Sequence, residues 1–203
     1  TIEVICAYRV PLTATTSSDQ SFDWKDYLTA RSSIADVKNV HSHTIIWMSI
    51  IGLSVFWALS QVLLATYPSY IKEAFKIQNV AILQGLMACA GIGIFIGSLI
   101  AGRLSKHFIE TGLVPLGAVG VFVTIGLITW WDSLLLQAVN FLMLGVMGGL
   151  FVVPLNALMQ YHADNNQLGR TLATNNLMQN IMMLGFLVGA IALSWIGFKG
   201  AGL

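Results

Sequence analysis

Five long segments of this chain contain no Asp, Glu, Lys or Arg, and they limit what the chain can fold into. They are residues 44–66, 80–102, 113–131, 133–161 and 171–198. Each is near or above the roughly 20 residues that an α-helix needs to cross the hydrocarbon core of a bilayer. We therefore predict an all-α protein, a polytopic bundle of five transmembrane helices.

The composition agrees with this prediction and argues against several other classes of protein. Charged residues make up 9% of the chain, whereas a soluble domain carries about a quarter. A net charge of +1 gives no basis for binding nucleic acid. Cys6 and Cys89 form no metal or redox motif. The sequence shows no nucleophile–base pair, metal cluster or phosphate loop, so we predict no enzymatic activity, no metal and no cofactor.

The polar residues are confined to the ends and the connections. Residues 1–43 are expected to form the end of a preceding helix and a linker with an amphipathic helix over residues 21–40. That helix either lies on the membrane surface or docks a partner. Residues 199–203 would begin another connection. Because the chain starts at Thr1 without a signal peptide, we interpret it as a fragment of a longer membrane protein.

The distribution of Lys and Arg predicts the orientation in the membrane. Seven of the ten cations lie on one side, in the linker, in the hinge at residues 103–112 and in the loop that ends at Arg170. Positive residues favour the cytoplasmic side. The opposite side collects the aromatic residues typical of a membrane interface, namely Tyr67, Tyr70, Trp130, Trp131 and Trp195. The linker and the hinge are therefore predicted to face the cytoplasm.

Small residues indicate where helices approach one another. Three Gly-x-x-x-Gly pairs place two glycines on one helix face, at residues 93 and 97, 145 and 149, and 185 and 189. Such faces allow close packing of backbones, and a moving seam along the substrate path is the other interpretation. Pro154 removes a backbone hydrogen bond and is predicted to kink the fourth segment.

Amides are the principal polar side chains inside the membrane segments. The candidate substrate-path residues are Asn156, Asn175, Asn176, Gln179, Asn180, Gln61 and Asn140. A buried amide without a partner is costly in lipid. These side chains therefore either bond between helices or line a path for a polar headgroup. No carboxylate is embedded, so these segments supply no obvious residue for coupling to protons or sodium.

Three blocks of sequence resemble a known family. They are Phe56-Trp57 through Tyr67-Pro68-Ser69-Tyr70; Arg103-Leu104-Ser105 with residues 109–117; and residues 148–158 with Gly169-Arg170 and residues 173–176. The chain resembles the C-terminal half of a major facilitator superfamily transporter, and within that superfamily the bacterial lysophospholipid transporters. Such a half should hold six helices, of which five are present. Gly102 and Ser105 replace the aspartate and the glycine of the general superfamily hinge.

The resemblance implies a function. It implies movement of lysophospholipids, lysophosphatidylethanolamine foremost, across the bacterial inner membrane by alternating access, for reacylation. The implied partners are the lysophospholipid, membrane lipids, the N-terminal half of the transporter, and an acyltransferase that is fused or separate. Two alternatives stay open. In the first, the protein is another facilitator that exports drugs or metabolites. In the second, it is a non-transporting membrane module that docks an acyltransferase.

The charges of the hinge suggest a gate. Arg103, Lys106, Glu110 and Arg170 are predicted to share the cytoplasmic side. Glu110 is the only carboxylate of the hinge, and we expect it to pair with one of these cations. In the alternative interpretation the cations are anchors whose side chains reach the lipid headgroups.

Overall fold

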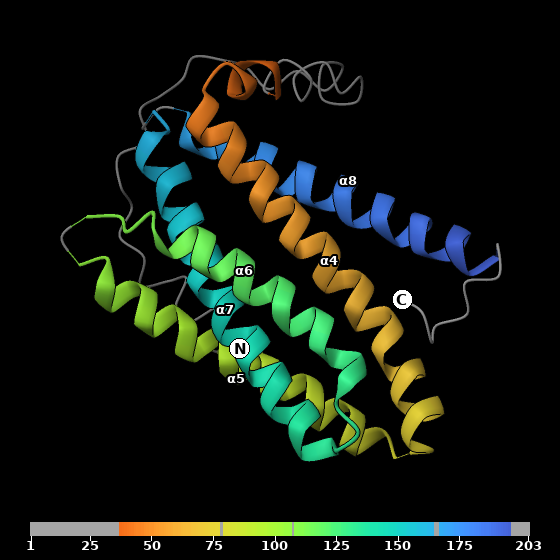
Figure 1. The fold of residues 1–203 in the computed structure, drawn as a ribbon. Helices are drawn as coiled ribbons and strands as arrows, with labels where there is room; N and C mark the ends of the chain where they lie inside the picture. Colours follow the sequence, from red (N-terminus) through yellow and green to blue (C-terminus); the bar gives the residue numbers. More distant parts are fainter. Residues whose placement is uncertain (1–36, 78, 107, 165–166, 196–203) are drawn as a thin grey trace, which may run out of the picture. The chain divides into compact units, whose positions relative to one another are not determined.

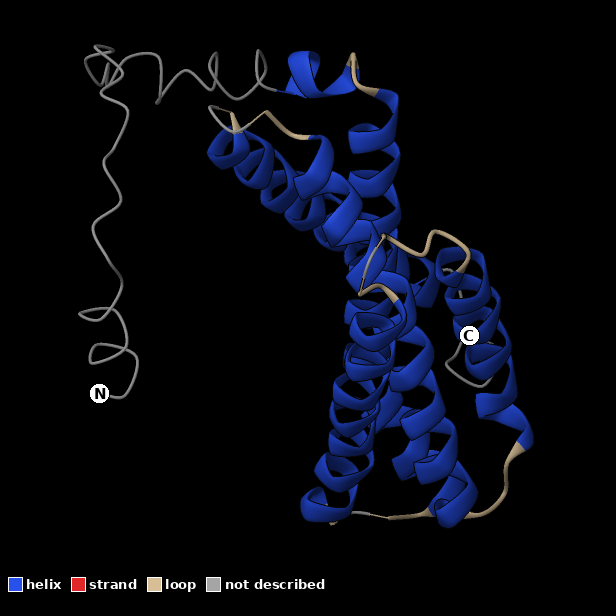
Figure 2. Cartoon of the chain, turned by 90° about the vertical axis from the view of Figure 1, so that its left-hand side faces the viewer, coloured by secondary structure: helices blue, strands red, loops and turns tan. Residues whose placement is uncertain are grey.

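The structure, a computed structural model, describes residues 37–77, 79–106, 108–164 and 167–195 (Figure 1). Most of the predicted linker, with its amphipathic helix, and residues 199–203 lie outside the described residues. The long helices are α4 (Thr44–Phe75), α5 (Val80–Leu104), α6 (Leu113–Leu127), α7 (Leu134–His162) and α8 (Leu168–Trp195). A 3-10 turn, η1 (Ile128–Trp130), extends α6. In Figure 2, the regular secondary structure of the described residues consists of helices. This confirms the predicted all-α class.

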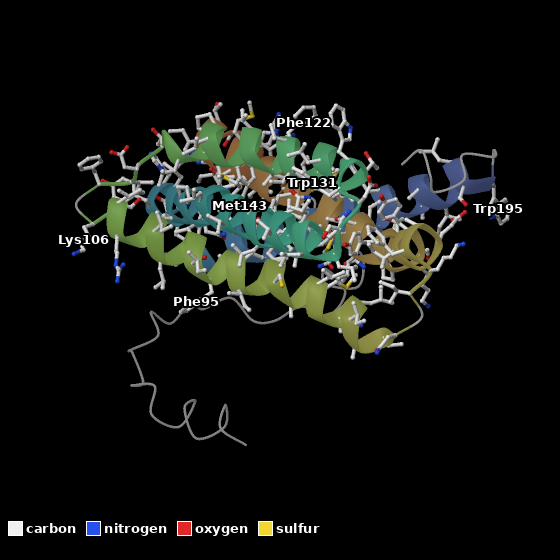
Figure 3. All side chains as sticks on the ribbon, turned by 60° about the horizontal axis from the view of Figure 1, so that its bottom comes forward. Phe95, Lys106, Phe122, Trp131, Met143 and Trp195 are labelled. Atoms are coloured by element: carbon white, nitrogen blue, oxygen red, sulfur yellow. The ribbon has the colours of Figure 1, made fainter. Side chains whose placement is uncertain are left out.

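All five helices are long and apolar enough to cross a membrane. Their most apolar stretches have a mean hydropathy between 1.8 and 2.1. Large apolar side chains point away from the neighbouring helices, including Phe95 of α5 and Phe122 of α6 (Figure 3), whose exposed fractions are 64% and 80%. Such side chains suit a surface that faces lipid, where a helix satisfies all of its backbone groups internally.

The helices differ from the charge-free segments mainly at one end of α4. This helix continues through Pro68 to Phe75, whereas the charge-free segment ends at Thr66. Tyr67 and Ile71 are buried against Leu83 of α5 and other residues, and this packing holds the extra turns in place. Lys76 ends the helix in the left-handed conformation, with φ 55°. Within α7, the helix remains continuous through Pro154.

The neighbours of each helix follow from the contacts. Helices α5 and α6 both pack on α7, and α4 packs on α7 and α8. The main neighbour of α8 is α4 (Figure 1). The buried residues described for α8 are Thr171, Thr174 and Asn175, all in its first third. The rest of α8 is much less covered than the other four helices.

Glycines hold α5 and α7 at very short range. A Cβ atom added to Gly93 would lie 2.9 Å from the Cα of Gly145, and one added to Gly149 would lie 2.7 Å from the backbone nitrogen of Ser98. Real Cβ atoms do not approach other atoms so closely, so only glycine fits. The close-packing prediction is confirmed for the first two glycine pairs. Around Gly185 and Gly189 of α8, a Cβ atom would meet nothing within 4 Å.

We expect the substitution Gly145→Ala to destabilise the protein. Its Cβ would lie 2.7 Å from the backbone nitrogen of Ile94, and a backbone cannot give way as a flexible side chain does. Overpacking of this kind costs about 1–3 kcal/mol. The thermal unfolding midpoint of the full-length protein in detergent should fall.

Gly85→Ala is the matched control, because Gly85 also lies in this helix pair, on α5, with open space around its Cα. Alanine favours a helix over glycine, so this substitution should leave the midpoint unchanged or raise it slightly. Equal midpoints for the two variants would contradict the role given to the glycine contact.

Candidate functional site

A cavity of about 260 Å³ lies between α4, α5, α6 and α7. Most of its lining is aliphatic, and three aromatic residues, Phe56, Trp57 and Phe141, contribute to it. The polar side chains in the lining are those of Ser60 and Gln61. The Ser60 hydroxyl donates to the Phe56 carbonyl at 2.8 Å and is thereby satisfied. The Gln61 amide is the polar group left to meet a bound molecule.

A larger cavity, of about 790 Å³, lies between α4, the end of α6 with η1, and α8. Leu59, Leu63 and Ile125 line both cavities, so the two adjoin. The larger cavity is also mainly apolar. Its hydroxyl-bearing residues lie toward the ends of α4 and α6, at Thr66, Tyr67, Tyr70 and Thr129. Gly185 and Gly189 contribute to the wall formed by α8.

The amides of α8 bond within their own helix. The Gln179 amide donates to the Asn175 side-chain oxygen at 3.1 Å. The Asn180 amide donates to the Asn176 carbonyl at 2.8 Å. Asn175 is buried, while Asn176 and Asn180 are exposed. Neither bond reaches another helix, so a headgroup-facing role for α8 stays a prediction.

The other candidate amides fall into three situations. The Asn156 amide donates to the Val152 carbonyl of its own helix at 3.0 Å. The Asn140 amide of α7 donates to the Thr124 carbonyl of α6 at 3.0 Å, which is an interhelical bond. Gln61 lines the smaller cavity. These three amides, which the sequence analysis placed in one group, therefore differ in their hydrogen-bond partners.

The hinge residues lie where α5 ends and α6 begins. Arg103 is exposed in the last turn of α5, and Lys106 is exposed just beyond it (Figure 3). Glu110 is half-buried. Its backbone nitrogen donates to the Ser105 hydroxyl at 3.4 Å, and its carbonyl accepts from Leu113 at 3.2 Å. Both contacts belong to the backbone, so the pairing of the Glu110 carboxylate in a gate stays a prediction.

The last linker residues meet the connection between α7 and α8. The Asn39 amide donates to the Gln167 side-chain oxygen at 2.7 Å. Val40, Ile46, Ile50 and Met159 form one buried apolar cluster. The end of the linker and the connection that leads to Arg170 therefore lie at the same end of the helices. This arrangement matches the side that the cation count assigned to both.

Gln137 is a buried polar residue that the sequence analysis missed. Its side chain is fully buried in α7, and its amide donates to the carbonyls of Ile128 at 2.7 Å and Trp131 at 3.0 Å. Carbonyls at the end of a helix lack partners within the helix. An amide one turn after the break at residues 131–133 is well placed to supply one. The position of Gln137, one turn after this break, could therefore have predicted its role from the sequence.

The described residues contain no group of three or more His, Cys, Asp or Glu that could hold a metal ion. The described residues offer two adjoining apolar cavities with one amide, that of Gln61, and several hydroxyls at their walls. Chemically, this arrangement can bind and release an amphiphilic molecule through burial and hydrogen bonds.

Comparison with known proteins places this arrangement in a family. The family model described as Major Facilitator Superfamily matches residues 4–187. The lysophospholipid transporter LplT of Yersinia pestis (strain Pestoides F) is 32% identical over 147 residues, which cover 71% of this chain and 36% of that protein. The LplT of Yersinia pseudotuberculosis serotype O:3 (strain YPIII) gives the same values.

The chain thus spans about a third of the length of the curated relatives it matches. No solved structure matches it significantly. The family match extends over most of the chain and includes four of the five membrane helices and most of the fifth. The chain is a multi-pass membrane protein that belongs to the major facilitator superfamily of transporters.

Proposed function

We propose that this chain is part of a transporter that moves lysophospholipids, lysophosphatidylethanolamine foremost, across the bacterial inner membrane for reacylation. The observation that carries the proposal is the smaller cavity, whose lining is apolar except for Ser60 and the Gln61 amide. Relatives named as lysophospholipid transporters, at 32% identity, support the same substrate class.

A lysophospholipid has one acyl chain and one charged headgroup, and each part makes a different demand. The acyl chain is stable against apolar walls, while the headgroup needs hydrogen-bond partners wherever it leaves water. Small-molecule pockets generally enclose about 300–1,000 Å³ and combine apolar walls with a few placed polar groups. The larger cavity, of about 790 Å³, lies within this range, and the smaller one, of about 260 Å³, adjoins it. A sugar would need many more polar groups than these walls provide.

The remaining parts of the proposal concern orientation and partners. We place the hinge at residues 103–112 and the linker in the cytoplasm because seven of the ten cations lie on that side. Transport would proceed by alternating access together with the N-terminal half of the transporter. The product, a lysophospholipid in the inner leaflet, is then available to an acyltransferase, fused or separate.

Uptake of labelled lysophosphatidylethanolamine tests the function as a whole. The full-length transporter in proteoliposomes should carry this lipid across the bilayer, and vesicles without protein should not. Diacyl phosphatidylethanolamine is the matched control, since its second acyl chain would need additional apolar volume. Transport of a soluble metabolite in place of the lysolipid would favour the exporter alternative. No transport by a folded protein would favour a module that docks an acyltransferase.

Replacing Gln61 with leucine tests the role of the smaller cavity. Leucine removes the hydrogen-bonding group that the amide offers to the substrate, and a hydrogen bond to a charged group contributes about 1.5–3 kcal/mol. Lysolipid uptake by Gln61→Leu should therefore fall roughly tenfold or more. Gln84→Leu is the control, because Gln84 is exposed on α5 outside the lining of both cavities. Similar uptake by both variants would remove Gln61 from the substrate path.

Reversing the charge of Glu110 tests the predicted cytoplasmic gate. Glu110→Lys adds a third cation near Arg103 and Lys106 and removes the carboxylate with which they are expected to pair. Lysolipid uptake should fall several-fold, and a higher salt concentration should weaken the effect. Glu73→Lys, on the exposed last turns of α4, is the control and should transport normally. Normal uptake by Glu110→Lys, at normal protein levels, would favour the anchor interpretation.

A further inference from the structure

The end of α6 leaves backbone carbonyls that need partners. The α-helix ends at Leu127, η1 follows, and Trp131 is extended, with φ −97° and ψ 113°. At such an end the last carbonyls have no intrahelical donor. The Ile128 carbonyl closes the 3-10 turn, and because Ile128 is buried, water does not readily reach the second lone pair of this oxygen.

One side chain satisfies two of these carbonyls and also reaches a third helix. The Gln137 amide nitrogen of α7 donates to the carbonyls of Ile128 and Trp131. The Gln137 oxygen accepts from the Tyr67 hydroxyl of α4 at 3.4 Å, a longer and weaker contact. The side chain thus uses both its donors and its acceptor. It joins the α6–α7 turn to α4.

Packing around Gln137 closes this junction to water. The Tyr67 ring lies 4.3 Å from the ring of Phe141, centroid to centroid. Both rings belong to a buried cluster with Ile71, Leu83 and Leu86. One turn along α7, Asn140 bonds in turn to the Thr124 carbonyl of α6. Two consecutive amides on one face of α7 therefore hold the last turns of α6.

We propose that Gln137 is a positioning residue that makes this end of α4, α6 and α7 move as one body during transport. Without the amide, both carbonyls lose a buried hydrogen bond, and water can replace it only if the turn separates from α7 and α4. A separated turn would also displace Tyr67 and Ile128, which form part of the wall of the larger cavity. The link to transport rests on the proposed function; the coupling of the three helices rests on the hydrogen bonds alone.

Hydrogen exchange followed by mass spectrometry tests the coupling directly in the full-length transporter. In Gln137→Leu, the backbone amides of residues 125–140 should exchange about tenfold faster, since loss of a hydrogen bond to a buried group changes an opening equilibrium by about this factor. Exchange in residues 142–150, where the glycines of α7 meet α5, should stay the same. Gln84→Leu is the control and should show no change in either segment.

Transport kinetics then separate positioning from simple stability. Gln137 is absent from the linings of both cavities, so Gln137→Leu removes no direct contact with the lysolipid, and the apparent affinity should change less than the maximal rate. The maximal uptake rate per folded transporter should fall several-fold. An unchanged rate per folded transporter would reduce Gln137 to a purely structural role. Unchanged exchange in residues 125–140 would overturn the proposal altogether.

A second variant decides the matter if Gln137→Leu does not fold. Tyr67→Phe keeps the ring and removes only the hydroxyl that links α4 to Gln137. It should fold, and exchange in residues 125–140 should rise by a smaller factor; no rise would overturn the coupling to α4. Because exchange is measured without substrate, it tests Gln137 even if the wild-type transporter proves not to carry lysophospholipids.

Discussion

The contact between α5 and α7 is the interaction on which the rest of the arrangement depends. Within lipid, helices gain little from hiding apolar surface, since the surrounding tails are as apolar as the side chains. Close backbone approach supplies dispersion contacts instead, and glycine permits it at Gly93, Gly145 and Gly149. Helix α7 then presents its other faces to α4 and α6, and the smaller cavity forms where these four helices meet.

The fold followed from the sequence because bilayer physics leaves few choices. In lipid, a charge-free segment that is long enough to cross the membrane satisfies its backbone groups most simply as a helix, and each of the five segments contains a membrane-length helix in the described residues. The close approach of the α5 and α7 backbones at two glycine pairs could also be predicted, since small residues at this spacing form one helix face. The extension of α4 to Phe75 could not be predicted in this way. Burial of Tyr67 and Ile71 depends on side chains from other helices, which a local pattern does not contain.

The candidate site was predictable only in kind. Composition indicated that amides would carry the polar chemistry, but the partners of an amide depend on how the helices turn toward one another. Asn140 bonds to a neighbouring helix, Asn156 bonds to its own, and Gln61 lines a cavity. Gln137 escaped notice because it lies at the edge of a charge-free segment, where an amide normally meets headgroups or water. Its burial results from the turn between α6 and α7.

The length of α4 has a consequence for the lipid around the protein. Its 32 residues extend about 48 Å at 1.5 Å per residue, against a hydrocarbon core about 30 Å thick. Since Tyr67 and Ile71 are fixed to neighbouring helices, α4 cannot shed its last turns to fit a thinner membrane. The helix therefore has to tilt or to extend beyond the hydrocarbon core. If it tilts, the helices packed against it must accommodate its tilt angle. The thickness of the bilayer should therefore influence the tilt of α4 and of the helices packed against it.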